Sequence, residues 1–152
     1  MEQHVSAAPA GHRTVTPYLI VRDARALIEF MERAFGGAVV HRQDTPDGAV
    51  RHAEVQIGDS RIMLADAKEG WPPMPAMVHL YVDDVDAVYR RALAAGATSI
   101  HEPEDMPYGD RSGGVRDACG NLWWIATRVE DLTDEEIVRR VAARDAEAAG
   151  RG

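Results

Sequence analysis

Residues 16–23 read TPYLIVRD, and residues 77–84 read MVHLYVDD. Both segments are rich in apolar, β-branched and aromatic residues before an acidic end, which is typical of β-strands. Three matched pairs lie 61 residues apart, namely Leu19 and Leu80, Val21 and Val82, and Asp23 and Asp84. The chain therefore contains an internal repeat, and we expect its two halves to fold alike.

An amphipathic helix is predicted after each of these strands. Apolar side chains recur three and four residues apart, which places them on one helical face. They are Ala24, Leu27, Ile28, Met31 and Phe35 in the first half and Val85, Val88, Tyr89, Ala92 and Leu93 in the second. Glycines follow both runs, at residues 36–37 and 96, as is common at helix ends.

Shorter extended segments complete each half, and a proline-rich link, WPPMP at residues 71–75, joins the halves. The expected strands cover residues 38–42, 50–57 and 60–65, then 97–101, 112–116 and 122–127. The prediction is an α+β fold in which two tandem βαβββ modules form a curved mixed-sheet cup. Module 1 is expected at about residues 14–66 and module 2 at about 76–127, within one domain at 14–127.

The two ends of the chain differ from this domain. Residues 1–13 are rich in Ala, Pro, Gly and His without periodicity, so we expect a disordered N-terminal tail. Residues 128–152 are predicted to form a C-terminal helical extension. Thr133 and Glu136 have the spacing of a capping box at its start.

Composition narrows the partners and the compartment. The chain has 152 residues and a net charge of −8, with 17 basic and 25 acidic side chains. Such an acidic protein is a poor partner for nucleic acid or for anionic membranes, because basic residues supply that attraction. The single cysteine, Cys119, cannot form an intrachain disulfide, and we expect it to be a turn residue. With no signal-like or spanning segment in view, a cytoplasmic protein is expected.

A hairpin at residues 50–65 indicates which side chains share a face. If Gly58 and Asp59 form a two-residue turn, Ile57 opposes Ser60, Val55 opposes Ile62 and Glu54 opposes Met63. Apolar residues then face the helices, and the opposite face carries His52, Glu54 and Met63. In module 2 the same face carries Met77, His79, Tyr81 and Trp124, while Trp123 joins the core. This face is either a ligand-binding surface or simply solvated.

Several motifs together resemble one known superfamily. They are the two βαβββ halves, FGG at 35–37, HAEVQIGDSRIMLAD at 52–66 and RDACGNLWWIAT at 116–127. The chain resembles the vicinal oxygen chelate superfamily of glyoxalases, bleomycin-resistance proteins and extradiol dioxygenases. The hairpin and ATRVEDLTDEEI at 126–137 are most similar to its PhnB-like branch. The resemblance implies an open cup that is often completed by dimerisation, and hence a homodimer.

Metal-dependent members of that superfamily place His, Gln or Glu ligands on four strands. Carried over by the resemblance, these positions fall on Thr16, Met63, Met77 and Trp124. None of the four is a usual ligand for a divalent ion that prefers imidazole or carboxylate. We therefore predict no metal and no cofactor.

The resemblance then implies a metal-free protein that binds a small molecule, with drug or antibiotic sequestration of the bleomycin-resistance type as one form. Met and Trp in the cup suit an aromatic or apolar ligand. The predicted lining is Tyr18, His52, Glu54, Met63, Met77, His79, Tyr81 and Trp124, with Arg111 at the rim from the loop Tyr108–Arg111.

Two rival hypotheses stay open. One is a glyoxalase-type lyase, isomerase or dioxygenase, using a relocated metal at His52, Glu54 and His79 or Glu54 as a catalytic acid–base. The other is an accessory protein whose C-terminal helix docks on a partner. Trp71 in the link is interpreted as ordinary packing between modules, with a stacking lid or interface plug as the alternatives.

Overall fold

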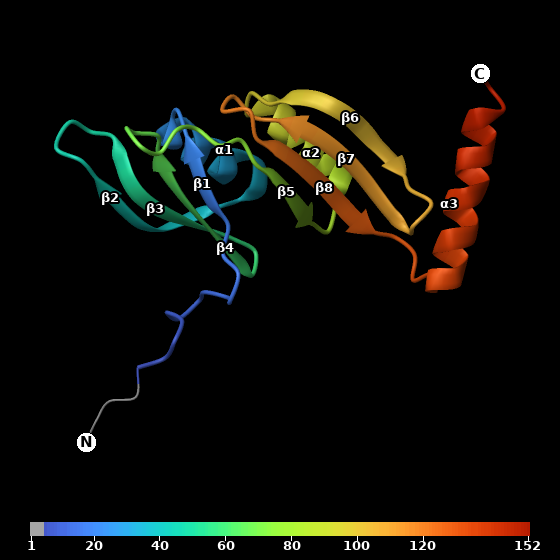
Figure 1. Cartoon of the computed structure of the whole chain (residues 1–152), viewed down its shortest axis with the longest axis horizontal. Coiled ribbons are helices and arrows are strands. Elements are labelled where there is room, and N and C mark those ends of the chain that lie inside the picture. Colours follow the sequence, from blue (N-terminus) through green and yellow to red (C-terminus); the bar gives the residue numbers. More distant parts are fainter. Residues whose placement is uncertain (1–4) are drawn as a thin grey trace.

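In the computed structural model, which describes residues 5–152, two similar modules lie side by side and a C-terminal helix stands at one end (Figure 1). Module 1 consists of β1 (Tyr18–Val21), α1 (Ala24–Phe35), β2 (Ala38–Asp44), β3 (Val50–Ile57) and β4 (Ser60–Asp66). Module 2 consists of β5 (Met77–Tyr81), α2 (Val85–Ala94), β6 (Thr98–Asp105), β7 (Asp110–Arg116) and β8 (Leu122–Arg128). Helix α3 (Asp134–Ala149) follows.

Each module contains one four-stranded mixed sheet. The strand orders are β1-β4-β3-β2 and β5-β8-β7-β6, with the first pair of each parallel and the others antiparallel. The predicted α+β fold of two βαβββ modules is confirmed. The hairpin register is also as predicted, since Ile57 pairs with Ser60, Val55 with Ile62 and Glu54 with Met63.

The acidic end of the repeated segment begins the helix in both modules. The Asp23 carboxylate accepts a hydrogen bond from the Ala26 amide at 2.9 Å, and Asp84 accepts one from Ala87 at 3.0 Å. These N-caps satisfy amides that have no partner within the helix. The repeat therefore preserves a structural function as well as an apolar pattern.

A second device holds each helix start to the sheet beneath it. Asp66, at the end of β4, accepts a hydrogen bond from the Ala24 amide at 2.7 Å. Thr127, 61 residues later on β8, accepts one from the Val85 amide at 2.9 Å. The carboxylate in module 1 and the hydroxyl in module 2 perform the same task, so each fourth strand is tied to its own helix.

The core lies between the two sheets and the helices α1 and α2. The two helices also pack against each other. Its buried side chains form one continuous cluster that includes Leu19, Val55 and Trp123. Trp123 is fully buried, whereas the neighbouring Trp124 is only partly buried on the other face, so the predicted alternation of the two tryptophans is confirmed. Burial of this apolar surface is the main stabilising contribution to the fold.

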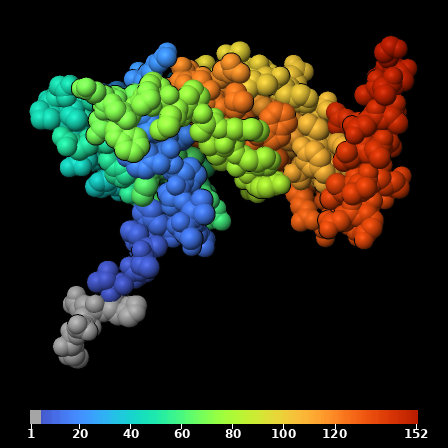
Figure 2. Space-filling view, in the orientation of Figure 1, coloured from blue at the N-terminus to red at the C-terminus, as the bar shows by residue number. Residues whose placement is uncertain are grey.

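The link between the modules runs back along module 1. The Met74 amide donates to the Ile20 carbonyl oxygen at 3.0 Å, so the link lies beside β1. Figure 2 shows this stretch, in light green, on the surface of module 1. It therefore forms a wall beside the sheet.

Helix α3 has a different kind of attachment. Thr133 caps it as predicted, accepting from the Glu136 amide at 3.3 Å. No side chain of α3 is buried. Its arginines form ion pairs with the body of the protein, Arg140 with Glu130 and Arg144 with Glu104. Within residues 5–152, neither this helix nor the other two is long and apolar enough to cross a membrane.

Candidate functional site

The predicted site residues divide between two sheets. The open face of a sheet is defined here as the face away from the helices. Four residues belong to module 1 and four to module 2, namely Tyr18, His52, Glu54 and Met63, then Met77, His79, Tyr81 and Trp124. Tyr18 pairs with Met63, and 61 residues later His79 pairs with Trp124. The repeat thus builds two equivalent open faces, one in each module.

Arg111 is not at the rim of these faces. Strand β7 begins at Asp110, two residues earlier than expected, so Arg111 is a strand residue instead of a loop residue. Alternation turns its side chain toward α2, where the guanidinium donates to the Asp86 carboxylate at 2.7 and 3.0 Å. Asp105 is a further partner at 3.2 Å. The Arg111 guanidinium is therefore already bound by carboxylates on the helix side of the sheet.

On module 1 a carboxylate lies at the centre of a polar network. Glu54 Oε1 lies 3.3 Å from His52 Nε2, and Glu54 Oε2 lies 2.9 Å from His12 Nε2 and 3.4 Å from Arg61 Nη1. Burial acts to raise the pKa of Glu54, but the hydrogen bond from His52 and the charges of His12 and Arg61 outweigh it, so the pKa is lowered. Glu54 is thus a carboxylate near neutral pH, with both oxygens engaged.

His12 comes from the segment predicted as a disordered tail. Residues 1–4 of that segment lie outside the described residues. The His12 side chain is only 6% exposed and lies against Glu54 on the open face of module 1. The sequence pattern could not predict this contact, because His12 alone makes it and a single residue leaves no periodic signal.

The network orients Tyr18. Its hydroxyl lies 2.9 Å from His52 Nδ1, and the two rings are 5.5 Å apart. If His52 Nε2–H donates to the Glu54 carboxylate, Nδ1 is left as the acceptor for the Tyr18 O–H. Burial raises the pKa of Tyr18, so its hydroxyl keeps the proton that this bond requires. A chain of three groups thus fixes the aromatic ring of Tyr18.

The four positions at which the resemblance implies metal ligands do not suit a metal here. Met63 and Met77 offer thioethers, and the Trp124 indole N–H is a donor only. The Thr16 hydroxyl donates to the Arg13 carbonyl oxygen at 3.3 Å. The relocated set is not assembled either, because His79 lies on the other sheet from His52 and Glu54. Across residues 5–152, no three His, Cys, Asp or Glu side chains gather closely enough to hold a metal ion.

The open face of module 2 is aromatic. The rings of His79 and Tyr81 are 4.8 Å apart, and those of His101 and Trp124 are 5.6 Å apart. Trp124 lies flat on Gly114, where a Cβ atom would come within 2.7 Å of the indole. Hydrogen bonding to Asp110 at 3.1 Å raises the pKa of Tyr81, which therefore remains a neutral phenol.

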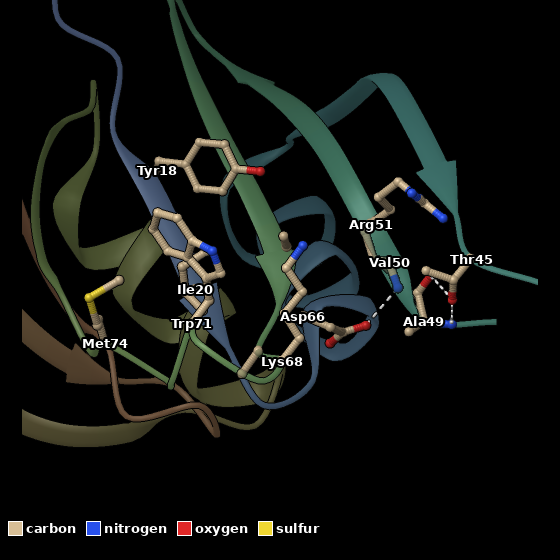
Figure 3. A pocket seen from close by; sticks show the side chains of 12 residues that line it. Tyr18, Ile20, Thr45, Ala49, Val50, Arg51, Asp66, Lys68, Trp71 and Met74 are labelled. Atoms are coloured by element: carbon tan, nitrogen blue, oxygen red, sulfur yellow. Dashed lines mark hydrogen bonds between the residues drawn. The ribbon is translucent and has the colours of Figure 1, made fainter. Parts of the chain in front are cut away.

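A cavity of about 760 Å³ lies beside the open face of module 1 (Figure 3). Strands β1 and β4, the start of β3, the turn at 45–49 and the link enclose it, and we call it the link cavity. Its lining is Tyr18, Ile20, Thr45, Ala49, Val50, Arg51, Ala65, Asp66, Ala67, Lys68, Trp71 and Met74. Of the nine side chains predicted from the sequence to contact a ligand, only Tyr18 belongs to it.

A tight turn at residues 68–71, where the chain enters the link, places two of these side chains on the same side. Lys68 and Trp71 exchange both backbone hydrogen bonds, at 2.9 and 3.0 Å, across Glu69 and Gly70. Gly70 has φ +79°, which suits the third position of a type II turn. Side chains of such a directly opposed pair lie on one side of the ribbon. Figure 3 shows both within the link cavity.

Trp71 is 55% exposed, so it is not packed between the modules as we interpreted it from the sequence. Its neighbours in the cavity, Tyr18 and Met74, are 47% and 49% exposed. Sequence reasoning missed this site, although two features could have marked it, namely the tryptophan in a proline-rich link and the single lysine three residues before it. Neither signal indicates on its own that the link folds back onto β1.

Comparisons with known proteins agree with this architecture. The family model for the Glyoxalase/Bleomycin resistance protein/Dioxygenase superfamily matches residues 10–125. An uncharacterized protein of Mycobacterium bovis is 37% identical over 134 residues, covering 81% of this chain and 88% of its own. A counterpart in Mycobacterium tuberculosis has the same identity and 79% of its own length covered.

Solved structures give the same result. TioX from Micromonospora sp. ML1 superposes with a TM-score of 0.67 at 28% identity, covering 77% of this chain and 99% of that one. A PhnB protein from Bacillus cereus has the same fold, with a TM-score of 0.59 at 18% identity and coverage of 76% and 99%. With the family model matching most of its length, the chain belongs to the glyoxalase/bleomycin resistance protein/dioxygenase superfamily.

Proposed function

We propose that the protein is a metal-free small-molecule binding protein, and that it holds a planar, apolar or aromatic ligand in the link cavity. The observation that carries the proposal is the half-exposed wall formed by Tyr18, Trp71 and Met74. Aromatic rings and a thioether are well suited to stacking on flat ligands. Sequestration of a drug or antibiotic is the form of this activity that fits a binding site without its own reaction machinery.

The dimensions of the cavity support the proposal. Ligand pockets of roughly 300–1,000 Å³ take molecules of drug size, and this cavity lies within that range at about 760 Å³. Large apolar side chains left half in water at one place indicate a binding surface, whereas scattered ones do not. Tyr18 is held by His52, so this part of the wall is rigid before the ligand arrives.

Acid–base catalysis by Glu54 has less support. Both carboxylate oxygens are engaged, one by His52 and the other by His12 and Arg61. A general base needs an oxygen within hydrogen-bond reach of the substrate proton. Glu54 is also absent from the lining of the link cavity, so its place in the structure fits the orientation of Tyr18 better.

Titration with the neutral fluorophore N-phenyl-1-naphthylamine tests the binding proposal. We expect saturable fluorescence enhancement, and the Trp71→Ala variant should weaken the affinity about tenfold because the stacking surface is lost. Tyr108→Ala is the matched control, since Tyr108 is a 38% exposed aromatic of module 2, outside the link cavity. Absence of binding, or equal loss in both variants, would contradict the proposal.

We also propose that a second copy of the chain covers the open face of module 2. Met77 and Tyr81 are 63% and 69% exposed there, beside the partly exposed ring of Trp124. Exposed apolar surface of this kind favours association. Sedimentation equilibrium should give twice the 16.6 kDa of one chain, with Met77→Glu shifting the mass toward the monomer. A monomeric mass for the unaltered protein at micromolar concentration would contradict this.

A further inference from the structure

Lys68 is unusual in this chain. Sixteen of the 17 basic side chains are arginines, and Lys68 is the only lysine. It lines the link cavity together with Trp71, its partner across the turn. Figure 3 shows the Lys68 side chain extending from the link into the cavity, with its nitrogen directed toward the space between Trp71 and Arg51. An exposed ammonium group thus borders a cavity whose lining is partly aromatic and aliphatic.

The acid in the same lining forms no ion pair with Lys68. Asp66 Oδ1 accepts a hydrogen bond from the Ala24 amide at 2.7 Å, and Oδ2 accepts one from the Val50 amide at 2.6 Å. Its two oxygens are therefore committed to the backbone. Among residues 5–152, no carboxylate lies within 4.0 Å of the Lys68 ammonium.

The other polar groups of the cavity do not replace it as a donor to a ligand. The Tyr18 hydroxyl is directed to His52, and the Thr45 hydroxyl to Asp47 and Ala49. Arg51 and Lys68 are both exposed, but in Figure 3 the Arg51 guanidinium points away from Lys68 toward the outer edge of the sheet. Lys68 is thus the cation that a ligand in the cavity would meet, and Arg51 is a second positive charge at the margin.

We propose that the ligand of the link cavity is a planar aromatic molecule that carries one anionic group, held by the Lys68 ammonium while its rings lie against Trp71. This inference rests on the proposed binding function and specifies the ligand class. Lys68 is an exposed side chain, so an anion beside it forms an ion pair in partly solvated surroundings, and this attraction adds to the stacking on Trp71. The net charge of −8 does not oppose this, since the effect is local to the cavity.

Two fluorescent probes with the same rings distinguish the effect of ligand charge on affinity from the effect of ligand shape. 8-Anilinonaphthalene-1-sulfonate carries a sulfonate, whereas N-phenyl-1-naphthylamine is neutral. We expect the sulfonate to bind about threefold to fivefold more tightly to the unaltered protein, and Lys68→Met to remove most of this difference. Lys68→Arg should preserve the preference, and the affinity of the neutral probe should change less than about twofold in Lys68→Met.

The control variant is Arg90→Gln, which removes a cation exposed on α2 and outside the link cavity. It should leave both affinities unchanged, and circular dichroism verifies the fold of each variant. Equal affinities for the two probes, or a sulfonate affinity that Lys68→Met does not alter, would overturn the inference and leave the binding function standing. Failure of both probes to bind would overturn the binding function itself.

Discussion

Replacing Asp117 by alanine is expected to lower the free energy of unfolding by roughly 3–5 kcal/mol. Asp117 is 6% exposed, in the turn between β7 and β8. One oxygen accepts hydrogen bonds from the amides of Cys119 and Asn121, at 2.9 and 3.0 Å. The other accepts them from the Asn121 side chain at 2.9 Å and the Trp123 indole at 2.8 Å. Alanine would leave all four donors without this acceptor.

Urea denaturation followed by circular dichroism measures this loss. The matched control is Asp59→Ala, because Asp59 occupies the exposed turn between β3 and β4 in the other module. Its replacement should change the free energy of unfolding by no more than about 0.5 kcal/mol. A cost for Asp117→Ala as small as that of the control would show that the buried carboxylate does not hold the turn.

Asp66→Ala is expected to lower the free energy of unfolding by about 2–4 kcal/mol. The variant loses two hydrogen bonds to a carboxylate, one from the start of α1 and one from the start of β3. It also loosens Val50, which lines the link cavity. We therefore expect faster hydrogen exchange at the Ala24 and Val50 amides, as well as lower stability.

Thr127→Val provides the comparison in module 2, where a hydroxyl has the equivalent place. Its loss removes two neutral hydrogen bonds, one from the Val85 amide and one to the Val82 carbonyl oxygen, with little change in shape, and we expect a cost of about 1–2 kcal/mol. The same urea experiment ranks the two variants. If Thr127→Val proved as costly as Asp66→Ala, charge would not be the source of the difference between the modules.

Strand alternation explains why so much of the fold was predictable. The two-residue turn at Gly58 and Asp59 fixes the register of its hairpin, and the register in turn fixes which face every side chain takes. The same logic placed Trp123 in the core and Trp124 on the open face. Periodicity and turns are local properties, so the sequence displays them directly.

The site was less predictable because it depends on where segments meet. A start of β7 two residues earlier than expected turned Arg111 to the helix side, where Asp86 binds it. Two backbone hydrogen bonds, from Ala67 to Val21 and from Met74 to Ile20, hold residues 67–74 beside β1. These contacts make Lys68 and Trp71 part of a cavity, and no spacing in the sequence encodes them. His12 reached Glu54 in the same way, from a segment without periodicity.

The attachment of α3 has a consequence for how the protein responds to its medium. The helix buries no side chain and is joined to the body through arginine–carboxylate pairs at the surface. Dissolved ions weaken the attraction within such pairs. The Debye length, beyond which charges are largely screened, falls from about 8 Å at physiological ionic strength to about 3 Å in 1 M salt. The apolar core has no such sensitivity. High salt is thus expected to weaken the docking of this arm more than it weakens the folding of the two modules.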